Sequence, residues 1–183
     1  MTESERTRIS ELIVAIDGGN VHALDELSRL VSARMLSVAR ATVRDRALAE
    51  DVVQDSFVKI ITGAKGFKPN TNGYAWICKI VHNTALNALR RERRGNTVDI
   101  DEFFDISDGA DISEQASAAA DVKRATSALS PIERRLIYQK YFMDFTVRDS
   151  AKAVGKSKSQ VARLISAAEQ KMRDTISRDK TDG

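Results

Sequence analysis

The sequence predicts an all-α protein of two small helical domains joined by an acidic linker. The chain has 183 residues, of which 42% are hydrophobic and 5% aromatic, and only two are proline. It lacks the runs of β-branched residues that strands need. Several segments instead show a helix start signal followed by apolar residues at helical spacing. These observations favour a compact helical fold.

Charge divides the chain into three parts. Residues 1–94 carry 15 Lys/Arg against 11 Asp/Glu, residues 95–121 carry none against 8, and residues 122–183 carry 14 against 7. We therefore predict two basic domains, 1–94 and 122–183, separated by a flexible acidic linker at 95–121. A basic face on each domain would suit nucleic acid.

The first domain is predicted to contain four helices. Asn20 and Asp45 are suited to cap the second and the third of them. The expected ranges are 4–17, 21–43, 46–62 and 73–94.

The fourth predicted helix separates into two faces at about 100° per residue. Its core face consists of Ile77, Val81, Thr84, Ala85 and Ala88. The opposite side carries Trp76, Ile80, Asn83, Asn87, Arg90 and Arg94, with Lys79 beside it. We call the polar residues and Trp76 on this side, including Lys79, the polar stripe. Aromatic rings stack on bases, amides bond base edges and cations hold phosphates, so the stripe suits single-stranded nucleic acid. The alternative is that Trp76 belongs to the core and the arginines form a solvated helix end.

On the third predicted helix Asp51, Gln54, Asp55 and Val58 share one face, which we call the acidic face. Its apolar side consists of Ala49, Val52, Val53, Phe57 and Ile60. Asp51 and Asp55 are like charges one turn apart, which mildly destabilises an isolated helix. A basic partner protein would compensate this repulsion. Without further context, a solvated face near the helix start is the favoured interpretation.

The second domain begins with clear helix signals. Ser130 is a predicted N-cap with Pro131 at the first helical position, and Glu133 completes a capping box. Further along, Thr146 can cap a short helix that has Asp149 at its third position, where the helix dipole favours an acid.

The turn that follows predicts a DNA-binding helix-turn-helix. Gly155 supplies the left-handed residue that ends the short helix, and Ser157 with Gln160 forms a capping box for the next one. The apolar face of that last helix consists of Val161, Leu164, Ile165, Ala168 and Met172. The close spacing of Ala151, Gly155 and Val161 favours a helix-turn-helix over a plain helical hairpin.

The last helix of such a motif enters the major groove. Its predicted DNA-contacting residues are Lys156, Ser157, Lys158, Ser159, Gln160 and Arg163. Lys156 and Lys158 lie at the turn and are suited to phosphate. Ser159, Gln160 and Arg163 lie opposite or beside the core face, and Arg163 suits the O6 and N7 atoms of guanine.

Catalytic and metal-binding functions find little support. Gly155-Lys156-Ser157 resembles the tail of a P-loop, but Ser150 stands where that loop needs glycine, and no strand precedes it. His22 and His82 are isolated, and Cys78 is the single cysteine, so no internal disulfide forms. We expect no cofactor and no enzymatic activity. The absence of a long apolar stretch or a signal peptide predicts a cytoplasmic protein with no membrane insertion.

Two segments carry a resemblance to a known family. "AEDVVQDSFVKI", Phe67 and "YAWICKIVHNTALNALRRERR" together resemble region 2 of bacterial sigma factors, especially the extracytoplasmic-function (ECF) group. "LSPIERRLIYQKYFMDFTVRDSAKAVGKSKSQVARLI" is similar to region 4 of the same group. The resemblance covers nearly the whole chain outside the linker.

This resemblance implies a role for each surface. Asp51, Gln54, Asp55 and Phe57 match the helix that docks on the clamp of core RNA polymerase. The polar stripe matches the part that opens and reads the −10 element of promoter DNA. Region 4 would read the −35 element and dock on the polymerase flap. The linker, with Phe103 and Phe104, would occupy the RNA exit channel or act as a spacer, and an anti-sigma factor is a further expected partner.

The sequence also departs from the family. Many relatives have Glu-Ile-Ala where this chain has Asp149-Ser150-Ala151, and the last helix has fewer cations than theirs. The alternative function is a helix-turn-helix regulator that binds duplex DNA as a dimer. Such a regulator would not need the polar stripe.

Overall fold

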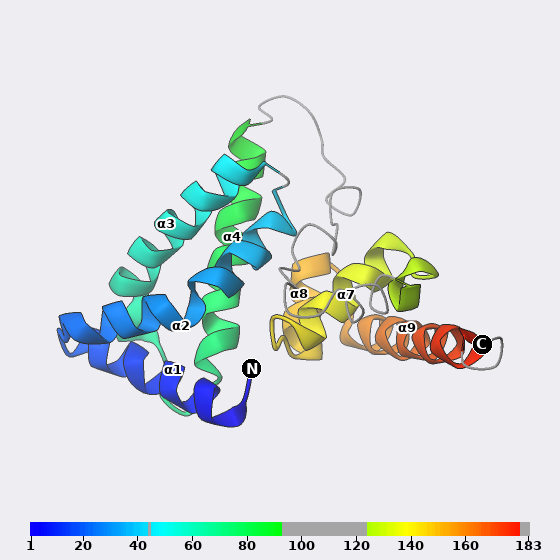
Figure 1. Cartoon of the computed structure of the whole chain (residues 1–183), viewed down its shortest axis with the longest axis horizontal. Coiled ribbons are helices and arrows are strands. Elements are labelled where there is room, and N and C mark those ends of the chain that lie inside the picture. The colour runs from blue at the N-terminus through cyan, green and yellow to red at the C-terminus, as the bar shows by residue number, and fades with distance from the viewer. Residues whose placement is uncertain (44, 93–123, 180–183) are drawn as a thin grey trace. The chain divides into compact units, whose positions relative to one another are not determined.

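The computed structural model of the chain describes residues 1–43, 45–92 and 124–179. The chain divides into two compact units, Met1–Val98 and Asp99–Gly183 (Figure 1). The described residues are helical and contain no β-strand, which confirms the predicted all-α class. The predicted linker at 95–121, with Phe103 and Phe104, lies outside the described residues. Its boundaries therefore stay a prediction.

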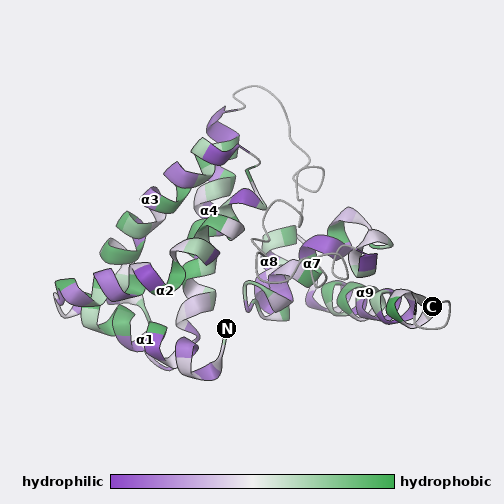
Figure 2. Cartoon of the chain, viewed as in Figure 1, coloured by the Kyte–Doolittle hydropathy of each residue, from purple (hydrophilic) through white to green (hydrophobic). Residues whose placement is uncertain are grey.

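The first unit packs its helices around α4. Its described elements are α1 (Glu3–Asp17), α2 (Val21–Arg40), α3 (Arg46–Gly63), the 3₁₀ turn η1 (Ala64–Gly66) and α4 (Gly73–Glu92). α4 contacts α1, α2 and α3, and its core side is covered by them. Figure 2 shows that each helix carries both apolar and polar residues, as amphipathic helices do. Fully buried Ile13, Leu27, Ile60 and Ile77 bring the four helices together in one core.

Local hydrogen bonds fix where these helices begin. Asn20 and Asp45 accept hydrogen bonds from the backbone of Ala23 and Leu48, which confirms both predicted caps. At the start of α4 the neighbouring helix α1 comes very close. A side chain at Gly73 would meet the Ser10 Oγ atom at 2.8 Å, so this position needs glycine. Ser10 Oγ in turn accepts a hydrogen bond from the Gly73 N–H at 3.1 Å.

The second helix is shorter than predicted. It ends at Arg40, whereas the sequence pattern extended it to residue 43. The Thr42 N–H bonds to the Ala39 carbonyl at 2.9 Å, so the last turn tightens from i→i−4 to i→i−3 bonding. Ala41, Thr42 and Val43 are nevertheless buried, which explains why their apolar pattern continued that of the helix.

In its described residues, the second unit contains three longer helices. Residues 124–127 are also helical, which the sequence pattern did not predict. The longer helices are α7 (Pro131–Tyr141), α8 (Val147–Val154) and α9 (Lys158–Asp179). Their core contains Leu136, Ala151, Val161 and Ile165, and Leu129, Ile137 and Ala168 form an adjoining cluster. This packing confirms the predicted apolar face of α9.

Candidate functional site

The core face of α4 is buried as predicted. Ile77, Val81, Thr84, Ala85 and Ala88 are all buried. Thr84 is polar, and its hydroxyl is satisfied there because it accepts a hydrogen bond from Lys59 Nζ at 2.9 Å and donates one to the Ile80 carbonyl at 2.8 Å. The opposite side of α4 is therefore the side that can meet a ligand.

The polar stripe changes character along α4. Trp76 and Lys79 are half-buried, whereas Asn83, Asn87 and Arg90 are exposed. Arg90 Nη1 donates to Asn87 Oδ1 at 3.2 Å, so these two side chains present a joined polar surface. Arg94 lies outside the described residues. The exposed part of the stripe can donate and accept hydrogen bonds at base edges and hold phosphate.

Trp76 belongs neither to the core nor wholly to the solvent-exposed stripe. Its ring packs against Phe67 with centroids 5.4 Å apart and planes tilted by 58°. Gly63 lies beside the same ring, and a side chain there would meet it at an ordinary contact distance of 3.6 Å. Trp76 is thus held in a fixed position while part of it stays accessible, which is the arrangement that stacking on a base requires.

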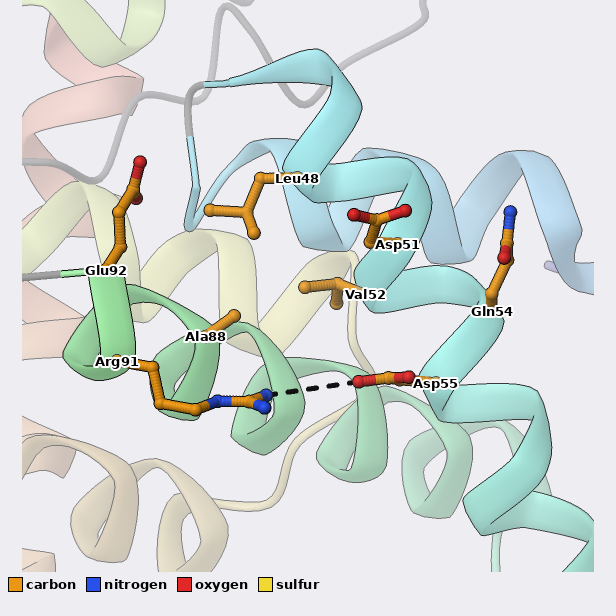
Figure 3. Close-up of a pocket in the computed structure, with 8 residues that line it drawn as sticks. All are labelled: Leu48, Asp51, Val52, Gln54, Asp55, Ala88, Arg91 and Glu92. Atoms are coloured by element: carbon orange, nitrogen blue, oxygen red, sulfur yellow. Dashed lines mark ion pairs between the residues drawn. The ribbon is translucent and has the colours of Figure 1, made fainter.

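The acidic face of α3 is exposed as predicted. Asp51, Gln54 and Asp55 are exposed, and Phe57 is half-buried. Beside this face lies a pocket of about 420 Å³ between α3 and α4 (Figure 3). We call it the α3–α4 groove; it is lined by Leu48, Asp51, Val52, Gln54, Asp55, Ala88, Arg91 and Glu92.

Among the described residues that line the groove, Arg91 is the one cation, and the sequence pattern did not identify it. Figure 3 shows its side chain reaching from α4 toward Asp55, where Nη2 and Oδ2 are 3.9 Å apart. Arg91 Nε also donates to the Asn87 carbonyl at 3.4 Å. Only the register between α3 and α4 brings Arg91 and Asp55 together, and no periodicity within either helix carries that information.

The helix-turn-helix has the predicted geometry. Thr146 and Asp149 form a capping box at the start of α8, and Gly155 ends the helix with φ 65° and ψ 30°. Gln160 N donates to Ser157 Oγ at 3.3 Å, and Ser157 N donates to Gln160 Oε1 at 3.0 Å. The capping box predicted for α9 is therefore confirmed.

The start of α9 presents a continuous polar surface. Lys156, Ser157, Lys158, Ser159, Gln160 and Arg163 are all exposed. Val161 on the other side of the helix is fully buried. Arg163 Nε bonds only weakly, at 3.4 Å, to the Ser159 carbonyl one turn earlier. An exposed helix start with two lysines at the turn can approach the phosphates of duplex DNA and direct Arg163 to base edges.

Comparison with known proteins relates the chain to transcription initiation factors. The Sigma-70 region 2 family model matches residues 27–95. The ECF RNA polymerase sigma factor SigM of Mycobacterium tuberculosis is 27% identical over 152 residues, which are 83% of this chain and 76% of SigM. Those 152 residues exceed the first unit, so the relationship extends into the second. The ECF sigma factor RpoE of Cereibacter sphaeroides is 29% identical over 70% of this chain and 72% of its own.

Residues 27–95 thus match Sigma-70 region 2, and the chain is similar to sigma factors of the ECF group.

Solved structures share the fold of this chain. The sigma factor RpoE of Bartonella quintana, solved with the anti-sigma factor NepR, aligns with a TM-score of 0.53 at 21% identity, over 84% of this chain and 97% of RpoE. CnrH, solved with the cytosolic domain of CnrY, aligns with a TM-score of 0.57 at 20% identity, over 94% of this chain and 99% of CnrH.

Ion pairs join α7 and α9 in the second unit. Glu169 accepts hydrogen bonds from Lys140 and from Tyr141 Oη, and these bonds, led by that from Lys140, lower its pKa. Lys171 Nζ bonds Glu133 at 2.8 Å. These pairs could not be predicted from the sequence, because they join residues 29 and 38 positions apart on different helices. They neutralise the charges of Glu133 and Glu169 within this unit.

The remaining candidate groups are structural in the described parts of the chain. Cys78 and His82 are buried on α4, and His82 Nδ1 lies 3.4 Å from Thr42 Oγ1. Within residues 1–43, 45–92 and 124–179 no three His, Cys, Asp or Glu side chains come together as a metal site. None of the helices described there is long and apolar enough to span a bilayer.

Proposed function

We propose that this chain is an ECF-type sigma factor that binds core RNA polymerase, directs it to promoters and helps to open the DNA there. The observation that carries the proposal is the pairing of two exposed surfaces in one small unit: an acidic face on α3 and the polar stripe on α4. A regulator that binds only duplex DNA needs neither surface. The factor contributes recognition and strand separation, and no catalysis of its own.

The acidic face is the proposed polymerase-docking surface. Asp51, Gln54 and Asp55 are exposed, and Phe57 is half-buried beside them. The repulsion between Asp51 and Asp55 costs little free energy in solvent. It is removed when a basic surface of the clamp covers both carboxylates. Docking should therefore depend on charge and weaken with salt.

The polar stripe is the proposed reader of the −10 element. Trp76 is fixed by Phe67, and the part of its ring that stays accessible would stack on an unpaired base. Asn83 and Asn87 can bond base edges. Lys79, Arg90 and, from the sequence, Arg94 would hold the strand by its phosphates.

The start of α9 is the proposed reader of the −35 element. Lys156 and Lys158 would contact phosphates at the turn. Ser159, Gln160 and Arg163 would face base edges, while Ser157 with Gln160 holds the helix start in shape. With few cations on this helix, region 4 should bind firmly only when the polymerase flap holds it in place.

An anti-sigma factor is a proposed regulatory partner. The related RpoE of Bartonella quintana was solved with the anti-sigma factor NepR, and the same fold here could accept a protein of that kind. We further propose that the factor acts in the cytoplasm, where its polymerase is.

Transcription reconstituted with core RNA polymerase tests the function. Core enzyme plus this factor should transcribe from a subset of genomic fragments that core enzyme alone ignores. Trp76→Ala should lose strand opening, with a cost of about 1–3 kcal/mol for each base that stacks on the ring, but should still bind core enzyme. Normal opening by Trp76→Ala would remove the stacking role.

Charge reversal tests the docking face separately. The double variant Asp51→Lys, Asp55→Lys should fail to assemble with core enzyme while its helical circular dichroism stays unchanged. The matched control is Asp17→Lys, Asp25→Lys, which reverses two exposed acids on α1 and α2 and should assemble normally. Tight binding to duplex DNA by the factor without polymerase would instead favour a dimeric regulator.

A further inference from the structure

Arg91 places a positive charge inside the surface that we assign to polymerase docking. The α3–α4 groove is lined by three acids, Asp51, Asp55 and Glu92, and by Arg91 as its cation (Figure 3). Arg91 and Asp55 form an ion pair at 3.9 Å, with side chains 65% and 58% exposed. A pair this long and this exposed is weak and easily exchanged for another partner.

The groove is shaped for a long cationic side chain. Its apolar lining, Leu48, Val52 and Ala88, can cover an aliphatic stem, and its acids can receive the charge at the end. Arg91 meets this description only in part. Its Nε atom bonds back to the Asn87 carbonyl of its own helix, and its terminal nitrogen reaches no closer than 3.9 Å to Asp55.

We propose that Arg91 is an internal competitor for the docking site. In the free factor it neutralises Asp55, and it must leave when an arginine or lysine of the polymerase clamp enters the groove to pair with Asp51 and Asp55. This inference rests on the proposed docking role of the acidic face. It makes Arg91 a residue that sets how tightly core enzyme is held.

Removing the competitor should strengthen docking. Arg91→Gln keeps a polar but shorter side chain and removes the charge, so the affinity for core enzyme should rise about two- to fivefold at low salt, as expected for one exposed ion pair. The gain should shrink at high salt, where surface charges are screened.

Arg29→Gln is the matched control. Arg29 on α2 is an exposed arginine that pairs with Asp25 at 2.7 Å. Its replacement changes the net charge by the same amount and also releases an aspartate, but outside the groove. Its affinity for core enzyme should equal that of the unaltered factor.

The test is a double-mutant cycle on the full-length factor, with binding to core enzyme measured by fluorescence without DNA. The variants are Arg91→Gln, Asp55→Asn, their combination and Arg29→Gln. Asp55→Asn should weaken binding, and in its background Arg91→Gln should give no gain, because nothing remains to compete for.

Each result has a distinct meaning. A gain from Arg91→Gln that depends on Asp55 supports the competition. Unchanged or weaker binding of Arg91→Gln, or a gain that persists without Asp55 or is matched by Arg29→Gln, overturns it while leaving the docking face intact. Unaltered binding of Asp55→Asn would overturn the docking role of Asp55 itself and the competition with it.

Discussion

Gly155 is the residue on which the helix-turn-helix depends most directly. Its backbone is left-handed, with φ 65°, and an added side chain would meet no atom within 4 Å. Space is therefore available, and the requirement for glycine comes from the backbone conformation alone. This separates it from Gly73, where contact with Ser10 sets the requirement.

Gly155→Ala should lower the free energy of unfolding by about 1–2 kcal/mol, the cost of a left-handed L-residue. Gly66→Ala is the control, because Gly66 also has open space around it but no positive φ. It should change the free energy by less than about 0.5 kcal/mol. Urea unfolding of both variants measures this; equal values would show that the turn relaxes without strain.

Glu133 should make stability depend on pH. Burial alone would raise the pKa of this carboxyl, but hydrogen bonds from Lys171 and Ser130 outweigh burial and hold it below its ordinary value of 4.5. A lowered pKa stabilises the fold above the unfolded-state pKa, and that stabilisation is lost as the pH falls through the lower, folded-state pKa. Glu133→Gln should cost about 1.5–3 kcal/mol near neutral pH.

The difference in the free energy of unfolding between Glu133→Gln and the unaltered factor should disappear at acidic pH, where Glu133 is protonated and neutral like glutamine. Urea unfolding at neutral pH and well below the ordinary value of 4.5 measures this. Glu11→Gln, at a carboxyl 59% exposed, is the control and should show little difference at either pH. If the difference in the free energy of unfolding were the same at both pH values, the effect of Glu133→Gln would come from packing and not from charge.

At the scale of elements, the helix starts and the buried faces could be predicted from the sequence. Ser130, Thr146 and Ser157 each bond a residue three positions away, so the sequence alone contains both partners. The partial burial of Trp76 could not be predicted, because it depends on contact with Phe67, which lies outside α4. The roles of the individual site residues stay predictions.

The start of α9 should contain two kinds of DNA contact that measurement can separate. Arg163→Ala should relax sequence preference at one or two −35 positions and cost about 1–3 kcal/mol there. Lys156→Ala should weaken all sequences alike and reduce the salt slope by about one. Arg173→Ala, at an exposed position further along α9, is the control and should do neither. The measurement is the affinity of the holoenzyme for a set of promoters with altered −35 sequences. If Arg163→Ala lowered the affinity for all of these sequences equally, Arg163 would be a phosphate contact.

At the scale of the whole molecule, DNA recognition should require both units and the polymerase. The fragment 122–183 carries 14 Lys/Arg against 7 Asp/Glu, but the start of α9 exposes only three of these cations. Its affinity for −35 DNA should be weak and should fall steeply with salt. Gel-shift titration of the fragment beside the holoenzyme measures this, with circular dichroism to confirm that the fragment is helical. Tight, sequence-specific binding by the fragment would favour the dimeric regulator.

The capping boxes have a consequence for how the chain acquires its fold. Thr2, Ser130 and Thr146 each open a helix through bonds to a residue three positions on. Such contacts close almost no loop, so they keep the contact order low and can form while the rest of the chain is still unordered. The first turn is the costly step in making a helix, and these boxes fix the residue at which it happens. Helices that nucleate at defined residues have their apolar faces formed before the chain collapses. The later steps of folding then consist of packing these helices against one another, because the helix boundaries are already set.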